Sequence, residues 1–112
     1  MPTAASYLNA IKESPIGAAA GTGTSCWVGG ELVTIKASGP ETNGAYALME
    51  HMTASHQGPP LHVHSREDEA FYVMEGRFLF KEGNREFTAS PGAFIFLPRG
   101  TTHTYTNIGS GP

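Results

Sequence analysis

The sequence predicts an all-β domain that closes as a sandwich or a barrel. Its 14 glycines and eight prolines stand between short apolar runs, so that turn signals recur about every eight to ten residues. Within several runs apolar and polar residues alternate, which is the pattern of a half-buried strand. No segment shows the spacing of a long amphipathic helix. About nine short strands separated by turns are typical of closed β folds.

Length and composition indicate one globular domain. The 112 residues can build a single modest core. Hydrophobic residues make up 39% and charged residues only 15%, which excludes a disordered chain. The formal net charge is −3 and the seven basic residues are scattered, so we expect no nucleic-acid partner.

The sequence shows no sign of membrane insertion or secretion. No apolar stretch approaches the length of a transmembrane helix. Residues 1–25 have no basic start, and Asn9, Lys12 and Glu13 interrupt any apolar run. We therefore predict no membrane association and a cytoplasmic location. Cys26 is the single cysteine, which excludes an internal disulfide, and we expect its thiol to be buried or half-buried.

Two regions divide the chain. Residues 1–25 are predicted to form an N-terminal arm, because the stretch from 16 to 25 is rich in Gly, Ala and Thr and lacks periodicity. Residues 26–112 form the β domain. Its strands are expected at 32–36, 45–52, 60–64, 69–75, 77–81, 85–89 and 93–97, with a last strand from 103 and a tight turn at Asn43-Gly44.

Four side chains with metal-binding chemistry lie in the second half of the chain. His62 and His64 stand at i and i+2 of an extended segment, so both imidazoles point to one side of the sheet. Glu69 and His103 follow further along. Three neutral imidazoles and one carboxylate suit a divalent Fe, Mn, Ni, Co, Cu or Zn ion better than Ca or Mg. The sequence therefore predicts a site for one transition-metal ion and leaves the metal open.

Glu67 and Asp68 compete with Glu69 for the role of carboxylate ligand. The alternation of the strand that begins at Glu69 favours this residue, because it shares one face with Phe71 and Val73. Glu67 and Asp68 are then expected to be solvated turn residues.

The segment around His103 predicts a corner followed by a strand. Pro98-Arg99-Gly100 turns the chain so that His103 points inward, and Tyr105 and Asn107 share its side of the strand. The Asn107 amide is expected to bind backbone groups of a nearby loop. His51 stands outside this pattern and is expected to be structural or on the surface.

These residues also form two motifs. The chain resembles the cupin superfamily, whose first motif is G-x(3–5)-H-x-H-x(3,4)-E-x(6)-G and whose second is G-x(5)-P-x-G-x(2)-H-x(3)-N. The first is matched by Gly58, His62, His64, Glu69 and Gly76, with Gly58 slightly closer to the histidines than is usual. The second is matched by Gly92, Pro98, Gly100, His103 and Asn107. Together they span residues 58–107, nearly half of the chain.

The resemblance implies a fold and a class of chemistry. A cupin domain at 26–112 implies a double-stranded β-helix, or jelly roll. The stretch from Pro60 to Val73 is similar to bacterial single-domain, type 2 cupins of the quercetin dioxygenase-like kind. That similarity implies a metal-dependent oxidoreductase, a dioxygenase that cleaves a flavonol-like or other aromatic or enol substrate with O₂.

Four protein ligands on an octahedral ion leave two positions for a small-molecule substrate and O₂. Glu69 can also act as the catalytic base on a substrate hydroxyl. Phe71 and Tyr105 are candidate substrate contacts, although ordinary core packing explains them equally well. The alternative is a non-redox metal-binding cupin, either an isomerase-type enzyme with Zn as Lewis acid or a small-ligand binding module.

The end of the chain bears on assembly. It stops soon after Asn107, whereas members of this family usually continue with at least one more strand. Either the chain is a fragment without a final strand, or a partner strand supplies the pairing. An uncovered sheet edge invites another chain, so we expect a homodimer, with residues 1–25 as the candidate exchanged segment.

Overall fold

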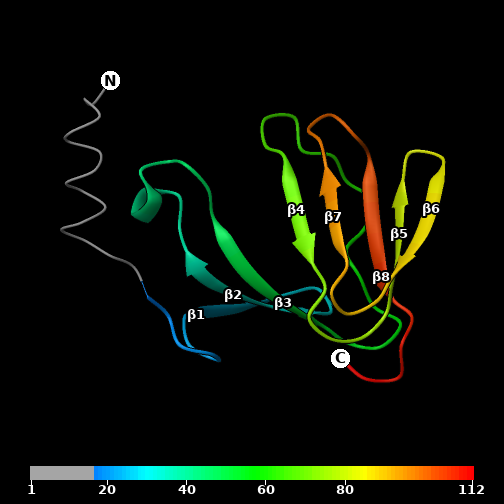
Figure 1. Cartoon of the computed structure of the whole chain (residues 1–112), viewed down its shortest axis with the longest axis horizontal. Helices are drawn as coiled ribbons and strands as arrows, with labels where there is room; N and C mark the ends of the chain where they lie inside the picture. Colours follow the sequence, from blue (N-terminus) through cyan, green and yellow to red (C-terminus); the bar gives the residue numbers. More distant parts are fainter. Residues whose placement is uncertain (1–16) are drawn as a thin grey trace. The chain divides into compact units, whose positions relative to one another are not determined.

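The computed structural model describes residues 17–112, and residues 1–16 lie outside the described part. By their contacts the described residues divide into two compact units, one with residues 17–25 and 34–50, the other with 26–33 and 51–112. The elements in chain order are β1 (Thr24–Val28), β2 (Glu31–Ala37), the 3₁₀ helix η1 (Pro40–Thr42), β3 (Leu48–Thr53), β4 (Glu69–Tyr72), β5 (Phe78–Glu82), β6 (Arg85–Ala89), β7 (Phe94–Leu97) and β8 (His103–Asn107) (Figure 1). Among the described residues no helix is long and apolar enough to cross a membrane.

Most of the expected strands are present, and two details of the first sheet differ. Strands β1, β2 and β3 are neighbours in that order, and the turn after β2 contains η1 and ends at Asn43 with a φ of 57°. Asn tolerates this left-handed conformation better than most residues. Strand β3 starts three residues later than expected, at Leu48. The prediction for Cys26 was wrong, because this thiol in β1 is exposed.

The expected arm is described only in part. Its first 16 residues lie outside the described range, and the described remainder contains the start of β1 at Thr24. The boundary after residue 25 therefore stays a prediction.

The larger unit contains two groups of antiparallel strands. Strand β4 pairs with β7, and β5 lies between β6 and β8. Figure 1 shows the β4–β7 pair beside the β6-β5-β8 sheet. The buried side chains of both groups pack into one core of Val73, Phe80, Ala89, Ile95, Leu97 and Tyr105. The core therefore lies between the two groups of strands and is rich in aromatic rings.

Alternation along the strands decides which side chains reach this core. In β8, His103, Tyr105 and Asn107 are buried and the two residues between them are half-buried, which confirms the predicted common face. In the segment that begins with β4, Val73 is buried and Phe71 is half-buried against the core. These two residues continue the face of Glu69, as predicted.

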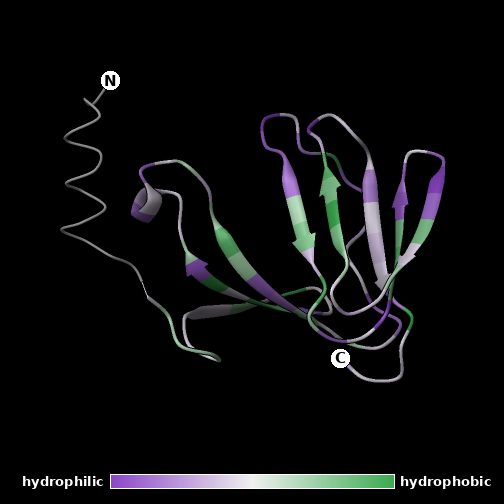
Figure 2. Cartoon of the chain, in the orientation of Figure 1, coloured by the Kyte–Doolittle hydropathy of each residue, from purple (hydrophilic) through white to green (hydrophobic). Residues whose placement is uncertain are grey.

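Strand β7 is hydrophobic along its length, as Figure 2 shows, but only half of its side chains are buried. Ile95 and Leu97 point into the core, whereas Phe94 and Phe96 are exposed. Tyr72 lies opposite Phe94 and is exposed on the same side, together with Met74. We call Tyr72, Met74, Phe94 and Phe96 the outer face of β4 and β7.

The segment expected as a strand at 60–64 is a single bridge instead. His62 pairs with His103, with hydrogen bonds in both directions between their backbone N–H and C=O groups. Pro59 and Pro60 precede it and have no N–H to donate, so no longer ladder forms here.

Gly58 lies against the backbone of β8, and this close approach predicts a large effect of a small substitution. A Cβ at Gly58 would collide with the carbonyl oxygen of Tyr105, whose strand is held by β5. We expect Gly58→Ala to lower the free energy of unfolding by about 1–3 kcal/mol, measured by urea denaturation. Gly111→Ala is the control, because no atom lies within 4 Å of a Cβ there. Equal unfolding midpoints for the two variants would contradict the close contact.

Candidate metal centre

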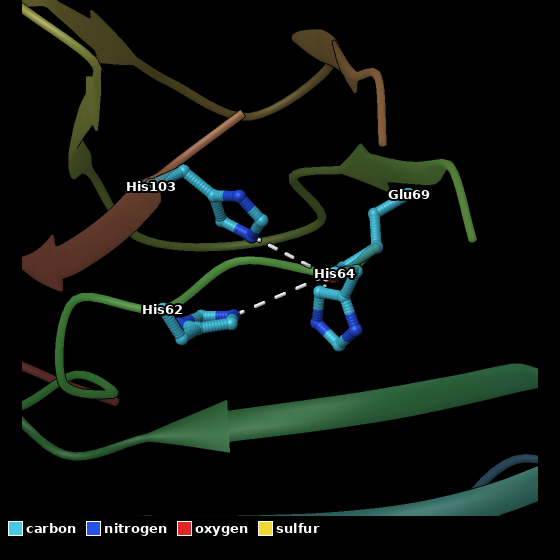
Figure 3. A group of neighbouring side chains, drawn as sticks. All are labelled: His62, His64, Glu69 and His103. Carbon is cyan, nitrogen blue, oxygen red and sulfur yellow. Dashed lines mark ion pairs between the residues drawn. The ribbon is translucent and has the colours of Figure 1, made fainter. Parts of the chain in front are cut away.

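Four side chains from separate parts of the sequence converge at one point in the larger unit (Figure 3). They are His62 and His64 from the bridge segment, Glu69 from the start of β4 and His103 from the start of β8. One potential ligand atom of each lies within 4.8 Å of all the others. Glu69 Oε1 is 3.3 Å from His103 Nε2 and 4.0 Å from His62 Nε2, and it also lies close to His64 Nε2. The structure thus brings together all four residues that the sequence predicted as ligands.

Backbone hydrogen bonds hold the two motifs together at this point. The His62–His103 bridge joins the first histidine of one motif to the histidine of the other. The Gly100 N–H donates to the carbonyl of His64 at 2.7 Å. Glu69 lies opposite Leu97 in the β4–β7 pair. The ligand geometry therefore depends on pairing between strands that are distant in the sequence.

Glu67 and Asp68 were predicted as solvated turn residues, and both are exposed but not free. Asp68 accepts hydrogen bonds from the backbone N–H of Arg99 at 2.9 Å and from its guanidinium at 3.2 Å. The Arg99 guanidinium, through its hydrogen bond, lowers the pKa of the Asp68 carboxyl. This pair connects the turn before Glu69 to the corner before His103.

Each histidine of the group has its other ring nitrogen engaged. His62 Nδ1 lies 2.8 Å from the carbonyl of Pro60, and His103 Nδ1 lies 3.0 Å from that of Thr101. His64 Nδ1 lies 3.1 Å from Glu67 Oε2. Carbonyl and carboxylate oxygens only accept, so each Nδ1 carries the proton and each Nε2 keeps its lone pair for a ligand.

The residues fit a transition-metal ion. Glu69 Oε1 and His103 Nε2 are buried side-chain atoms without a hydrogen-bond partner in the described part of the chain. Unsatisfied buried polar atoms are rare and costly, and here they belong to the ligand atoms themselves. Two ligand atoms on opposite sides of an ion at ~2.1 Å are about 4.2 Å apart, so the group is close to coordination spacing. A cation bound between these atoms would satisfy both.

Phe71 and Tyr105 lie in the layer of the core next to the ligands. Each follows a ligand by two residues on the same face of its strand, Phe71 after Glu69 and Tyr105 after His103. Their rings meet edge to face with centroids 5.3 Å apart. Tyr105 is only 5% exposed, whereas Phe71 is half-buried. Their role as substrate contacts stays a prediction.

Sequence reasoning missed a polar cluster around Glu31. This residue in β2 is 4% exposed, and its Oε2 accepts hydrogen bonds from the Tyr105 hydroxyl at 2.6 Å and the Thr53 hydroxyl at 2.8 Å. His51 Nδ1 lies 3.3 Å from the same oxygen and 3.0 Å from the Tyr105 hydroxyl. No motif marks Glu31, and the one available signal was a charged residue directly before the apolar pair Leu32-Val33.

The cluster shifts two pKa values in opposite directions. Burial raises the pKa of Glu31, but hydrogen bonds from His51, Tyr105 and Thr53 outweigh it, so the net pKa lies below the usual 4.5. Burial, and then the hydrogen bond to Glu31, raises the pKa of the Tyr105 phenol. Glu31 is therefore a buried carboxylate whose charge is stabilised by directed donors.

Comparison with known proteins places the chain in a family. The model of the Cupin domain family matches residues 48–112, more than half of the chain, and this chain therefore belongs to the cupins. Quercetin 2,3-dioxygenase of Bacillus subtilis is 28% identical over an alignment that covers 93% of this chain and 32% of that protein. The chain spans less than half the length of the curated relatives that it matches.

Solved structures agree on the fold. KdgF from Halomonas sp. superposes with a TM-score of 0.70 at 21% identity, covering 79% of this chain and 77% of that one. A predicted oxalate decarboxylase from Thermotoga maritima gives a TM-score of 0.68 at 21% identity, covering 72% and 71%. The predicted jelly-roll cupin fold is confirmed, and identities this low carry the fold alone.

The buried charge of Glu31 predicts a specific dependence of stability on pH. Because the folded-state pKa of Glu31 lies below 4.5, its contribution to stability is fully present above that pH and is lost as the pH falls through the folded value. The Glu31→Gln variant has no carboxylate at this position, so its stability lacks this pH-dependent contribution. We expect the gap in urea midpoint between the wild type and Glu31→Gln to be largest near neutral pH and to shrink below pH 4.5. A gap that is independent of pH would contradict an ionised Glu31.

Proposed function

We propose that this cupin is a metal-dependent dioxygenase that cleaves a flavonol-like or other aromatic or enol substrate with O₂. The observation that carries the proposal is the convergence of three imidazole nitrogens and the Glu69 carboxylate, with two of the four ligand atoms buried and unpartnered. The similarity to quercetin 2,3-dioxygenase across 93% of the chain supports the substrate class.

His62, His64, His103 and Glu69 would hold one divalent Fe, Mn, Ni, Co, Cu or Zn ion. When bound, a redox-active ion supplies positions for substrate and O₂ and a route for electrons between them. The imidazoles are oriented for metal binding, because each Nδ1–H donates a hydrogen bond to a protein oxygen and each Nε2 is left as the ligand atom.

The protein groups have separate tasks in this proposal. Glu69 is only partly exposed, and its carboxylate can accept a proton from a substrate hydroxyl beside the metal. The Phe71 and Tyr105 rings supply an apolar, aromatic wall next to the ligands, which suits an aromatic substrate better than a sugar.

We also propose that two copies of the chain associate through the outer face of β4 and β7. Tyr72, Phe94 and Phe96 lie on the paired strands β4 and β7, and Met74 follows β4 by two residues. Each of these four side chains is more than half exposed. A contiguous apolar surface of this kind is typical of an interface. A homodimer would cover the same face on both copies.

The metal content of variants tests the proposed ligands. The double variant His62→Ala/His64→Ala keeps two of the four ligands, which cannot hold a transition-metal ion against water. We expect the wild type to carry up to one equivalent of metal by elemental analysis and the double variant to carry almost none. His56→Asn is the control, because His56 is exposed and outside the ligand group. Full metal occupancy in the double variant would refute the site.

Oxygen consumption by different metal forms tests the proposed reaction. Protein reconstituted with Fe, Mn, Co or Ni should consume O₂ when a flavonol is added, and the Zn form should not, because Zn has no accessible redox change. Oxygen uptake measures this directly. Glu69→Gln should keep part of its metal but lose turnover steeply.

Different results would favour the alternative functions. Equal activity with Zn on a non-redox reaction would favour an isomerase-type enzyme. Tight binding of a small ligand without turnover by any metal form would favour a binding module. Unchanged turnover in Glu69→Gln would remove Glu69 from catalysis.

The mass of the protein in solution tests the proposed dimer. Light scattering at micromolar concentration should give the mass of a dimer. The double variant Tyr72→Glu/Phe96→Glu should be a monomer, because burying two carboxylates in the interface is costly. Thr88→Glu, which adds a charge at an exposed position on β6, should remain a dimer. A monomeric wild type would overturn the proposed interface.

A further inference from the structure

The Glu31 cluster contains a second group able to take a proton, outside both motifs. Its Tyr105 hydroxyl has one proton, and that proton is committed to Glu31 Oε2 at 2.6 Å. His51 Nδ1 faces the same Glu31 oxygen and the Tyr105 oxygen, which at this point can only accept. Nδ1 of His51 must therefore carry the proton, and Nε2 is left as the basic nitrogen.

The free side of this imidazole is accessible. The His51 side chain is 30% exposed, whereas that of Glu31 is 6% exposed. No hydrogen bond among the described residues engages His51 Nε2, although Nδ1 has two partners. A histidine whose one nitrogen is bound to a buried carboxylate is oriented and ready to accept a proton at the other.

The position of His51 relates it to the metal centre. Its ring meets the edge of Phe71, with centroids 6.4 Å apart, and its Nδ1 is 3.0 Å from the Tyr105 hydroxyl. Phe71 and Tyr105 are each two residues beyond a ligand on the same face of a strand, a step of about 6.6–6.8 Å. His51 therefore contacts the two aromatic residues that follow the ligands Glu69 and His103 along their strands.

We propose that His51, fixed by Glu31 and Tyr105, accepts the proton of a second acidic hydroxyl on the substrate bound at the metal centre. The inference rests on the proposed function and narrows its substrate class to aromatic or enol compounds with two separated acidic hydroxyls. Glu69 takes the proton of the hydroxyl beside the metal, and His51 takes that of the remote one.

The charges balance in this step. The Nε2 lone pair forms the new N–H bond, and the electron pair of the broken O–H bond stays on the substrate oxygen. The imidazolium that results lies beside the Glu31 carboxylate, whose lowered pKa keeps it ionised at neutral pH. Glu31 is thus a positioning residue that acts through His51.

Two ligands of one class test the inference without turnover. Quercetin has several acidic hydroxyls, and 3-hydroxyflavone has only the one beside its carbonyl. The zinc-loaded protein, kept free of O₂, should bind both, and ionisation beside the metal should red-shift the absorbance of both. Bound quercetin should show a further red-shifted band, from its second ionised hydroxyl. His51→Gln should weaken quercetin binding about tenfold or more, reduce that band, and leave 3-hydroxyflavone binding unchanged.

Two further variants separate position from chemistry. Glu31→Gln should show the same selective loss for quercetin, because it removes the charge that stabilises the imidazolium. His56→Asn is the matched control, since His56 is an exposed histidine with a left-handed φ of 64° that Asn tolerates. It should bind both ligands as the wild type does.

The outcomes are distinguishable. Equal losses for both ligands in His51→Gln, or no loss for either, would overturn the role of His51 and leave the metal centre intact. Wild-type protein that binds quercetin only in its neutral form would also overturn it. A wild type that holds no zinc would refute the proposed metal centre, and this inference with it.

Discussion

The reciprocal backbone hydrogen bonds between His62 and His103 are the interaction on which the rest of the site depends. They join a proline-rich loop to β8 across 40 residues of chain, and no longer ladder supports this contact. The hydrogen bond from Gly100 to His64 and the ion pair between Asp68 and Arg99 add to it on either side. Three short contacts thus place ligands from a loop and two strands at one point.

Bringing the four ligands together costs free energy, and a bound metal ion would offset that cost. Glu69 Oε1 and His103 Nε2 are buried among other ligand atoms without hydrogen bonds, and each such atom costs about 1–3 kcal/mol. Aromatic contacts among Phe71, Phe80 and Tyr105 in the core stabilise the strands that carry Glu69 and His103. A bound cation would convert these unsatisfied atoms into ligands, so metal binding and stability are expected to be coupled.

Strand β8 also takes part in a second polar cluster, together with residues of β2 and β3. Tyr105 connects this cluster to the core, because its ring packs in the core while its hydroxyl binds Glu31. Glu31 in turn is stabilised as an anion by donors from Thr53 and His51. In the proposed mechanism one strand, β8, provides both a metal ligand, His103, and the residue that connects to a second proton acceptor, Tyr105.

The sequence by itself determined the fold class, the four ligand candidates and the common face of His103, Tyr105 and Asn107, because motif spacing and strand alternation are local properties. Only the tertiary structure decided that residues 60–64 form a bridge rather than a strand, since proline removes donors that a ladder needs. It also decided that Asp68 pairs with Arg99 and that Glu31 is buried beside His51 and Tyr105. Such contacts join residues 20 to 74 positions apart, and no spacing rule reaches that far.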